Sequence, residues 1–386
     1  MLLTTFSEPL AAALTQKVKV LAGDGGAVVP RITVAPFIGI ARELYQLAHG
    51  RNPQIAADDL IRSLLAKAAA AEPGPAINER FLHSEWTHAV DAWQIKTAEA
   101  YIDVPRLGRK NRMGKKQRDR PWPVSARVIQ DLDSRGMVTE AGVFQAMASH
   151  HAAKAEKPFD HIVVDEAQDL GVPELRLLIA IASPGPNALF FAGDLGQRIF
   201  QQPFSWKTLG VNVQGRSHTL NVNHRTSHQI RETADRLLPG AIADVDGRGE
   251  ERKGTVSVFN GPVPVVVIAD TVAAEVAAVA TVIKVALDDG IQPEVIGVFV
   301  RTRAMIDRTR DAVEAAGRDA SEITLFKGGA PGHVRIGVIH LAKGLEFKAV
   351  AVMACDEDQL PLKSRLEAVV DETELDDVFD TERQLF

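Results

Sequence analysis

Hydrophobic and polar positions follow two different rhythms along the chain and divide it into two parts. Across residues 31–155 apolar residues recur every three or four positions; Ile40 and Leu44 mark one amphipathic helix, and 58–71 a second. From residue 160 onward, short apolar runs of strand length alternate with helical patterns. Strands alternating with helices of this length predict an α/β architecture with parallel sheets.

The second part contains most of the predicted strands. They lie at 161–164, 188–192, 256–259, 263–268, 295–300, 334–339 and 349–353. Helices are predicted at 174–182, 273–286 and 304–316. The Gly-, Asp- and Arg-rich stretch 237–254 predicts a joint between two sheets. A further strand is predicted at 2–6, followed by a helix whose N-cap is Ser7.

The strongest candidate for chemistry is the sequence Asp-Glu-Ala-Gln-Asp at 165–169, which follows a predicted strand. The carboxyl ends of parallel strands form the sheet edge where ligands bind. Asp165 can hold Mg²⁺ through its water shell, and Glu166 can orient or deprotonate an attacking water. The alternative is structural, because acids at a helix N-terminus are stabilised by the helix dipole.

Three further polar clusters follow later strands. Gln197 stands just beyond the predicted strand 188–192, a position from which it can sense a γ-phosphate. Arg225 leaves another strand, and an arginine so placed can stabilise charge on a transferring phosphoryl group. The third cluster, 340–347, turns through Lys343 and a glycine and presents Glu346 outward.

Aromatic residues after Gln197 form a candidate platform for stacking nucleic-acid bases. Phe204 and Trp206 lie in a polar stretch, which favours exposure of their rings. For Phe200 a place in the core is at least as consistent with the pattern.

The net charge averages two opposite runs. The chain has 44 Lys and Arg against 50 Asp and Glu, a net charge of −6. Residues 106–120 hold eight basic and one acidic side chain, whereas 367–382 hold eight acidic and no basic ones. The basic run is either a solvated loop or a patch for phosphate backbones. Its candidate contact residues are Arg109, Lys110, Lys115 and Lys116.

Composition excludes several classes of protein. The single cysteine, Cys355, excludes an intramolecular disulfide and any multi-cysteine zinc or iron–sulfur site. No stretch approaches the ~20 apolar residues of a membrane span. The start of the chain lacks the positive region and cleavage site of a signal peptide. We therefore expect a cytoplasmic protein.

The ordered motifs resemble those of the UvrD/Rep-like DNA helicases of superfamily 1. They are Asp-Glu-Ala-Gln-Asp at 165–169, Gly-Asp-x-x-Gln-x-Ile-Phe at 193–200, Asn-x-Arg-Thr at 223–226 and His-x-x-Lys-Gly-Leu-Glu-Phe at 340–347. The resemblance spans residues 160–361 and implies an α/β fold with two RecA-like P-loop NTPase domains. Their expected bounds are 1–222, with a helical insertion at 50–155, and 223–386.

The resemblance also implies roles for individual residues. Asp165 and Glu166 would bind Mg²⁺ and activate water, Gln197 and Arg225 would contact the γ-phosphate of ATP, and Glu346 would contact the ribose. Residues 3–7 look like the family's motif Ia, which touches single-stranded DNA. The residues implied to contact DNA are Thr5, Phe6, Phe204, Trp206, His340 and Lys343.

The sequence departs from the family pattern in two places. The phosphate-binding motif Gly-x-x-x-x-Gly-Lys-Ser/Thr does not occur; the nearest stretch, 108–116, has five residues between its glycines and a lysine in place of Ser/Thr. Residues 381–386 look like only the opening of the family's motif VI. We expect either an internal piece of a longer helicase, the favoured explanation, or a short protein that kept the fold and lost hydrolysis.

Two functional hypotheses follow. The first is an ATP- and Mg²⁺-dependent helicase or translocase, 3′ to 5′ by resemblance, monomeric, acting on single-stranded DNA or DNA junctions, with weak or absent ATPase in this chain. The second is a non-catalytic nucleic-acid-binding or interaction protein derived from a helicase. A DEAD-box-like RNA helicase is disfavoured, because it would show Asp-Glu-Ala-Asp at 165–168. Partners in repair or recombination stay open.

Overall fold

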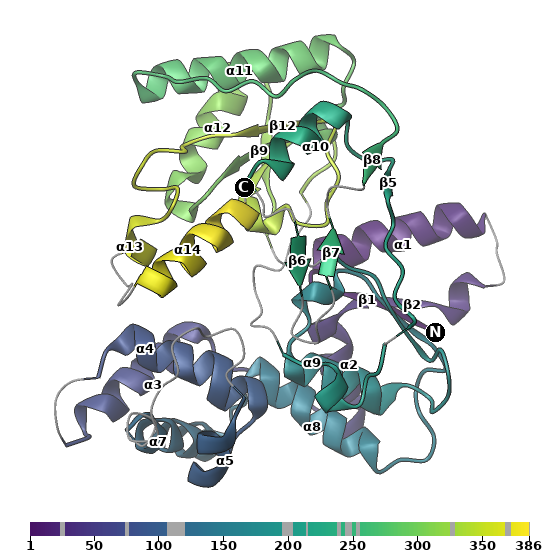
Figure 1. Ribbon diagram of the computed structural model, residues 1–386, viewed down its shortest axis with the longest axis vertical. Helices are drawn as coiled ribbons and strands as arrows, with labels where there is room; N and C mark the ends of the chain where they lie inside the picture. Colours follow the sequence, from purple (N-terminus) through teal and green to yellow (C-terminus); the bar gives the residue numbers. More distant parts are fainter. Residues whose placement is uncertain are drawn as a thin grey trace.

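The computed structural model is α/β, with two four-stranded parallel sheets flanked by helices (Figure 1). It describes residues 1–23, 28–73, 77–105, 120–194, 204–213, 215–237, 241–243, 249–251, 255–324, 329–366 and 372–385. The candidate residues Gln197, Arg109, Lys110, Lys115 and Lys116 lie outside the described residues.

The first sheet has the strand order β2-β1-β3-β4, and its neighbouring strands run parallel. The strands are β1 (Leu2–Thr5), β2 (Thr33–Pro36), β3 (Ile162–Val164) and β4 (Leu189–Phe191). Their helices are α1 (Glu8–Ala22), α2 (Phe37–His49), α8 (Glu140–Ala152) and α9 (Val172–Ile181). Leu2 and Ile162 lie side by side in register and are fully buried, which explains why these short apolar runs form strands. We call these elements the first sheet unit.

The second sheet has the order β10-β11-β9-β12, again with parallel neighbours. Its strands are β9 (Ile296–Val300), β10 (Ala320–Glu322), β11 (Val334–Val338) and β12 (Ala349–Val352). Its helices are α11 (Val272–Asp288), α12 (Ile306–Ala315), α13 (Lys363–Leu366) and α14 (Glu372–Leu385). The central strand β9 is buried at every position, as expected for a strand covered on both faces. We call these elements the second sheet unit.

A group of helices with its own hydrophobic core lies beside the first sheet unit (Figure 1). It consists of α3 (Asp58–Ala70), α4 (Glu79–Glu85), a π-helical turn (Trp86–Asp91), α5 (Ala98–Asp103) and α7 (Pro121–Ser134). Leu64, Leu82 and Val128 are among the buried side chains that join these helices. The amphipathic pattern of this stretch therefore closes around a core separate from both sheets.

Short elements connect the two sheet units. They are β5 (Val222–Asn223), α10 (His228–Asp235), β6 (Ala241–Ala243), β7 (Gly249–Glu251) and β8 (Val256–Ser257). β5 pairs with β8, and β6 pairs with β7 in an antiparallel ladder. The ladder lies in the stretch that the sequence predicted as a joint.

One predicted strand is wrong. Residues 263–268 form no strand in the structure, and Ile268 is 93% exposed. Strand propensity is realised only where a side chain fits a paired, half-buried surface, and Pro264 has no N–H to donate to a ladder. The predicted strand 256–259 is shortened to β8 for lack of a longer partner, since β5 has two residues.

No helix in the described ranges is long and apolar enough to cross a membrane.

Candidate functional site

The turn after β3, residues 165–169, carries three acidic side chains and is called here the carboxylate turn. The Asp165 N–H donates to the Thr4 carbonyl (2.9 Å), so the turn begins on the β1–β3 ladder. Glu166 has φ 55° and ψ 43°, in the left-handed region that non-glycine residues seldom occupy. Such constrained backbone occurs preferentially at functional sites, which directs attention to Glu166.

Gln168 holds the carboxylate turn in place. Its Nε2 donates to Glu166 Oε2 (2.5 Å), and its Oε1 accepts from the Asp194 N–H (3.0 Å). A Cβ on Gly193 would lie 2.3 Å from Gln168 Oε1, so a larger residue there would require the Gln168 amide to shift. No role was predicted for Gln168, although it lies inside the motif at 165–169. The structure makes it the link between the ends of β3 and β4.

A loop of the second sheet unit, residues 339–347, packs against this turn and is called here the lysine loop. Lys343 Nζ lies 2.8 Å from Asp169 Oδ1 and 2.7 Å from Oδ2, and the two side chains are 6% and 2% exposed. Gly344 has φ 76°, and a Cβ there would lie 2.5 Å from Leu10 Cδ2. The loop therefore approaches the first sheet unit closely and is joined to it by a buried ion pair.

Arg225 and Glu346 meet at the same junction. Arg225 Nη2 donates to the Leu345 carbonyl (2.5 Å), and its Nε lies 3.9 Å from Glu346 Oε1. Lys17 Nζ, from helix α1, lies 2.9 Å from the same Glu346 oxygen. The side chains of Lys17 and Glu346 are 55% and 52% exposed, so this pair is solvated, unlike Lys343–Asp169.

A polar turn presents Arg225. Asn223 Oδ1 accepts from the N–H groups of Arg225 (2.8 Å) and Thr226 (3.1 Å), and Asn223 Nδ2 donates to Thr226 Oγ1 (2.6 Å). Asparagine favours such side-chain-to-backbone turns, which explains the Asn-x-Arg-Thr sequence at this point.

The carboxylates of the junction differ in pKa. Burial raises the pKa of Glu166, although Lys343 and the Gln168 amide favour its ionised form. Burial raises the pKa of Asp169 to about 6 against the pull of Lys343. The hydrogen bond from Lys17 lowers the pKa of Glu346. A carboxylate whose pKa is raised by burial is better suited to accept a proton from water than a solvated carboxylate, which favours Glu166 over Glu346 for that role.

The structure brings together Asp165, Glu166, Lys343, Arg225 and Glu346 from distant parts of the sequence. In Figure 1 the second sheet unit (green to yellow) lies next to the first over this junction. Lys17 and Asp169 belong to the same cluster but received no role from the sequence. Asp169 could have been found as the last acid of its motif, whereas nothing in the sequence around Lys17 points to Glu346.

The remaining predicted DNA-contact residues are less accessible than the sequence indicated. Thr5 is fully buried, and Phe6 is partly buried against the first core. Phe204 and Trp206 also pack against that core, with the Trp206 and Phe191 rings edge to face at 4.6 Å. Both rings are partly buried, which differs from the expected exposure. His340 is partly buried, and burial lowers its pKa.

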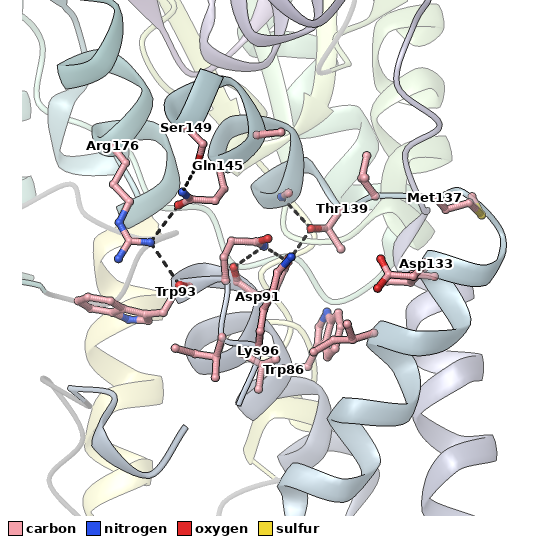
Figure 2. A pocket seen from close by; sticks show the side chains of 18 residues that line it. Trp86, Asp91, Trp93, Lys96, Asp133, Met137, Thr139, Gln145, Ser149 and Arg176 are labelled. Carbon is pink, nitrogen blue, oxygen red and sulfur yellow. Dashed lines mark hydrogen bonds between the residues drawn. The ribbon is translucent and has the colours of Figure 1, made fainter. Parts of the chain in front are cut away.

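A separate cavity of about 650 Å³ lies where the helical group meets the first sheet unit (Figure 2). Asp91 Oδ1 accepts from Thr139 Oγ1 (2.5 Å) and Gln94 Nε2 (2.7 Å). Arg176 Nη1 donates to the Trp93 carbonyl (3.2 Å) and to Gln145 Oε1 (3.1 Å). Because these polar groups bond to each other, they hold the two regions together.

The carboxylate turn contains Asp165, the residue that the sequence predicts to hold Mg²⁺. No group of three or more His, Cys, Asp or Glu side chains in those ranges is arranged to hold a metal ion. Mg²⁺ in nucleotide sites usually takes one or two carboxylates, with phosphate and water completing the shell. Asp165 suits that role.

No protein-family model matches the sequence, and no curated protein does.

Proposed function

We propose that this chain is the motor region of a superfamily 1, UvrD/Rep-like DNA helicase, which couples ATP hydrolysis to movement along single-stranded DNA. In this proposal the two sheet units are its two RecA-like domains. The observation that carries the proposal is the junction itself: Asp165 and Glu166 of one unit lie with Arg225 and Glu346 beside the other. An ATPase whose site lies between two units needs carboxylates on one side and a cation on the other.

The residues present fit the reacting end of a nucleotide. Mg²⁺ bound to ATP would neutralise phosphate charge, and Asp165 would hold it. Glu166 would accept a proton from water, a role favoured by its raised pKa and by the Gln168 bond that orients it. Arg225 would balance the charge on the phosphoryl group, and Glu346 would accept a hydrogen bond from the ribose.

The chain lacks the motif that would bind the inner phosphates of ATP. The sequence contains no Gly-x-x-x-x-Gly-Lys-Ser/Thr motif, whose backbone N–H groups and lysine cradle the phosphates in this class of enzyme. We therefore expect the chain to bind nucleotide weakly and to hydrolyse ATP slowly or not at all.

The test is binding of a fluorescent ATP analogue with Mg²⁺, and of single-stranded DNA, to the full chain. Arg225→Ala should weaken analogue binding at least about tenfold, since one charge-assisted contact is lost. The matched control is Arg236→Ala, because Arg236 is also an exposed arginine paired with a glutamate, Glu232. Equal binding by both variants and the unaltered chain would contradict a nucleotide site at the junction. Robust DNA-stimulated hydrolysis abolished by Glu166→Gln would instead show that the missing motif is dispensable.

The second candidate is a nucleic-acid-binding protein without catalysis, favoured by the missing phosphate motif and the basic run 106–120. It predicts salt-dependent binding of single-stranded DNA with no analogue binding. Neutralising Arg109, Lys110, Lys115 and Lys116 together should then weaken binding whatever the base sequence.

A further inference from the structure

The two sheet units are joined by one buried ionic contact among the described residues of the junction. The Lys343 ammonium lies within 2.8 Å of both carboxylate oxygens of Asp169, and both side chains are almost completely buried. The neighbours of the two residues belong to different hydrophobic cores: Ala167 of the carboxylate turn lies in the first, and Leu341 of the lysine loop packs against the second. This pair therefore acts between the units rather than within either of them.

Lys343 also lies at the start of a chain of contacts that ends at Arg225. The next residue, Gly344, lies so close to Leu10 that a Cβ would be 2.5 Å from its Cδ2, and the same Cβ would be in ordinary contact with Glu166 Oε1, at 3.4 Å. The carbonyl of the following residue, Leu345, accepts a hydrogen bond from the Arg225 guanidinium. Glu346 comes next in the chain. The residues that contact Asp169, Glu166 and Arg225 are therefore consecutive in the lysine loop.

We propose that Lys343 is a positioning residue: its ion pair with Asp169 docks the lysine loop on the carboxylate turn and so sets Arg225 and Glu346 opposite Glu166. This role differs from the DNA contact that the family resemblance implied for Lys343. Its meaning for catalysis rests on the proposed function, but the docking itself does not.

The solvated pair Lys17–Glu346 joins the same loop to helix α1 and provides a matched comparison. Its side chains are about half exposed, and exposed pairs contribute little to stability because solvent screens them. Removing one partner of a buried pair instead leaves an uncompensated buried charge, which is strongly unfavourable. The loop should therefore depend on Lys343 and hardly on Lys17.

The test is hydrogen exchange, followed by mass spectrometry, on the full chain without nucleotide. The N–H groups of Arg225 and Thr226 are bonded to Asn223, so their exchange reports whether that turn stays formed. Lys343→Met should accelerate exchange at least about tenfold at 341–346 and also at 223–226. Lys17→Met should change both segments less than about twofold, and Lys343→Arg should largely restore the protection.

Acceleration confined to 341–346 would overturn the proposal, because Lys343 would then only stabilise its own loop. If Lys343→Met does not fold, the reversed pair Lys343→Asp with Asp169→Lys decides. Protection of 223–226 within about threefold of the unaltered chain supports docking, and loss of that protection overturns it. Binding of the ATP analogue is measured in a separate experiment. The docking proposal therefore survives if no nucleotide binds, and the nucleotide site survives if the docking proposal is overturned.

Discussion

Two joints hold this molecule together, and each buries an aspartate whose pKa burial raises to about 6. At the junction of the sheet units, Asp169 faces the ammonium of Lys343. At the joint of the helical group, Asp91 accepts hydrogen bonds from neutral donors, Thr139 and Gln94. The two joints therefore differ in the partner of the buried carboxylate, which is a cation at the first joint and a pair of uncharged donors at the second.

The two joints are formed by different chemical groups. The ion pair of the first joint links two separate cores, and the groups around it are those proposed to act on a nucleotide. The second joint combines the hydrogen bonds that Asp91 accepts from Thr139 and Gln94 with the Arg176 guanidinium, which lies over the Trp93 ring at 5.6 Å.

The largest effect is expected from removing the cation of the first joint. Lys343→Met should lower the free energy of unfolding by about 3–5 kcal/mol, because the buried Asp169 carboxyl loses its cation and can stay buried only by taking up a proton. Urea unfolding at pH 7 measures this loss. The double variant Lys343→Met with Asp169→Leu should recover most of it, since the charge and its partner are removed together. If Lys343→Met lowers the free energy of unfolding by less than about 1 kcal/mol, the Lys343–Asp169 pair is solvated, and the first joint does not depend on a buried ion pair.

The second joint should respond to pH. Because the pKa of Asp91 is raised from 3.8 to about 6, the folded chain binds a proton between pH 7 and 5 that the unfolded chain does not. Stability therefore rises as pH falls through 6, and the Asp91 share of this rise is about 1 kcal/mol. Asp169 and Glu174, whose pKa values burial also raises, act in the same direction. Nearby Glu140 strengthens the effect by disfavouring the charge on Asp91.

Urea unfolding at pH 5 and pH 7 isolates this contribution. Asp91→Asn should remove the Asp91 share, so the gain in stability on acidification becomes about 1 kcal/mol smaller. The control is Asp133→Asn, because Asp133 lines the same cavity but is exposed. An unchanged difference between the two pH values in Asp91→Asn would show that Asp91 is hydrated and that the joint is not a proton-sensitive one.

The sequence predicts the sheets well where burial decides the structure. The run that forms β9 is apolar throughout, and the structure buries all of it, so local pattern and tertiary environment agree. The run 263–268 is equally apolar but forms no strand, because a strand needs a neighbouring edge that the local sequence does not specify. The difference lies in long-range pairing, which hydrophobic periodicity does not encode.

The same limit applies to the site. Asp165, Glu166, Arg225 and Glu346 could be named as candidates because each lies in a motif whose residue types suit phosphate chemistry. The partners that hold them are remote: Lys343 and Asp169 are 174 residues apart, and Lys17 and Glu346 are 329 apart. A motif indicates which groups can react, and only the fold shows which charges meet them.

The smallest effect is expected from breaking the exposed ion pair between Lys17 and Glu346. Lys17→Met removes a charge from the same junction, but its partner Glu346 is about half exposed and is also approached by Arg225. Water and Arg225 can stabilise the remaining carboxylate, so the free energy of unfolding should fall by less than about 1 kcal/mol. Added salt should reduce even this difference, because exposed pairs are screened. Urea unfolding at low and high salt measures both quantities. A loss comparable to that of Lys343→Met would mean that burial does not distinguish the two pairs, and that the junction is held by its total charge rather than by Asp169 and Lys343.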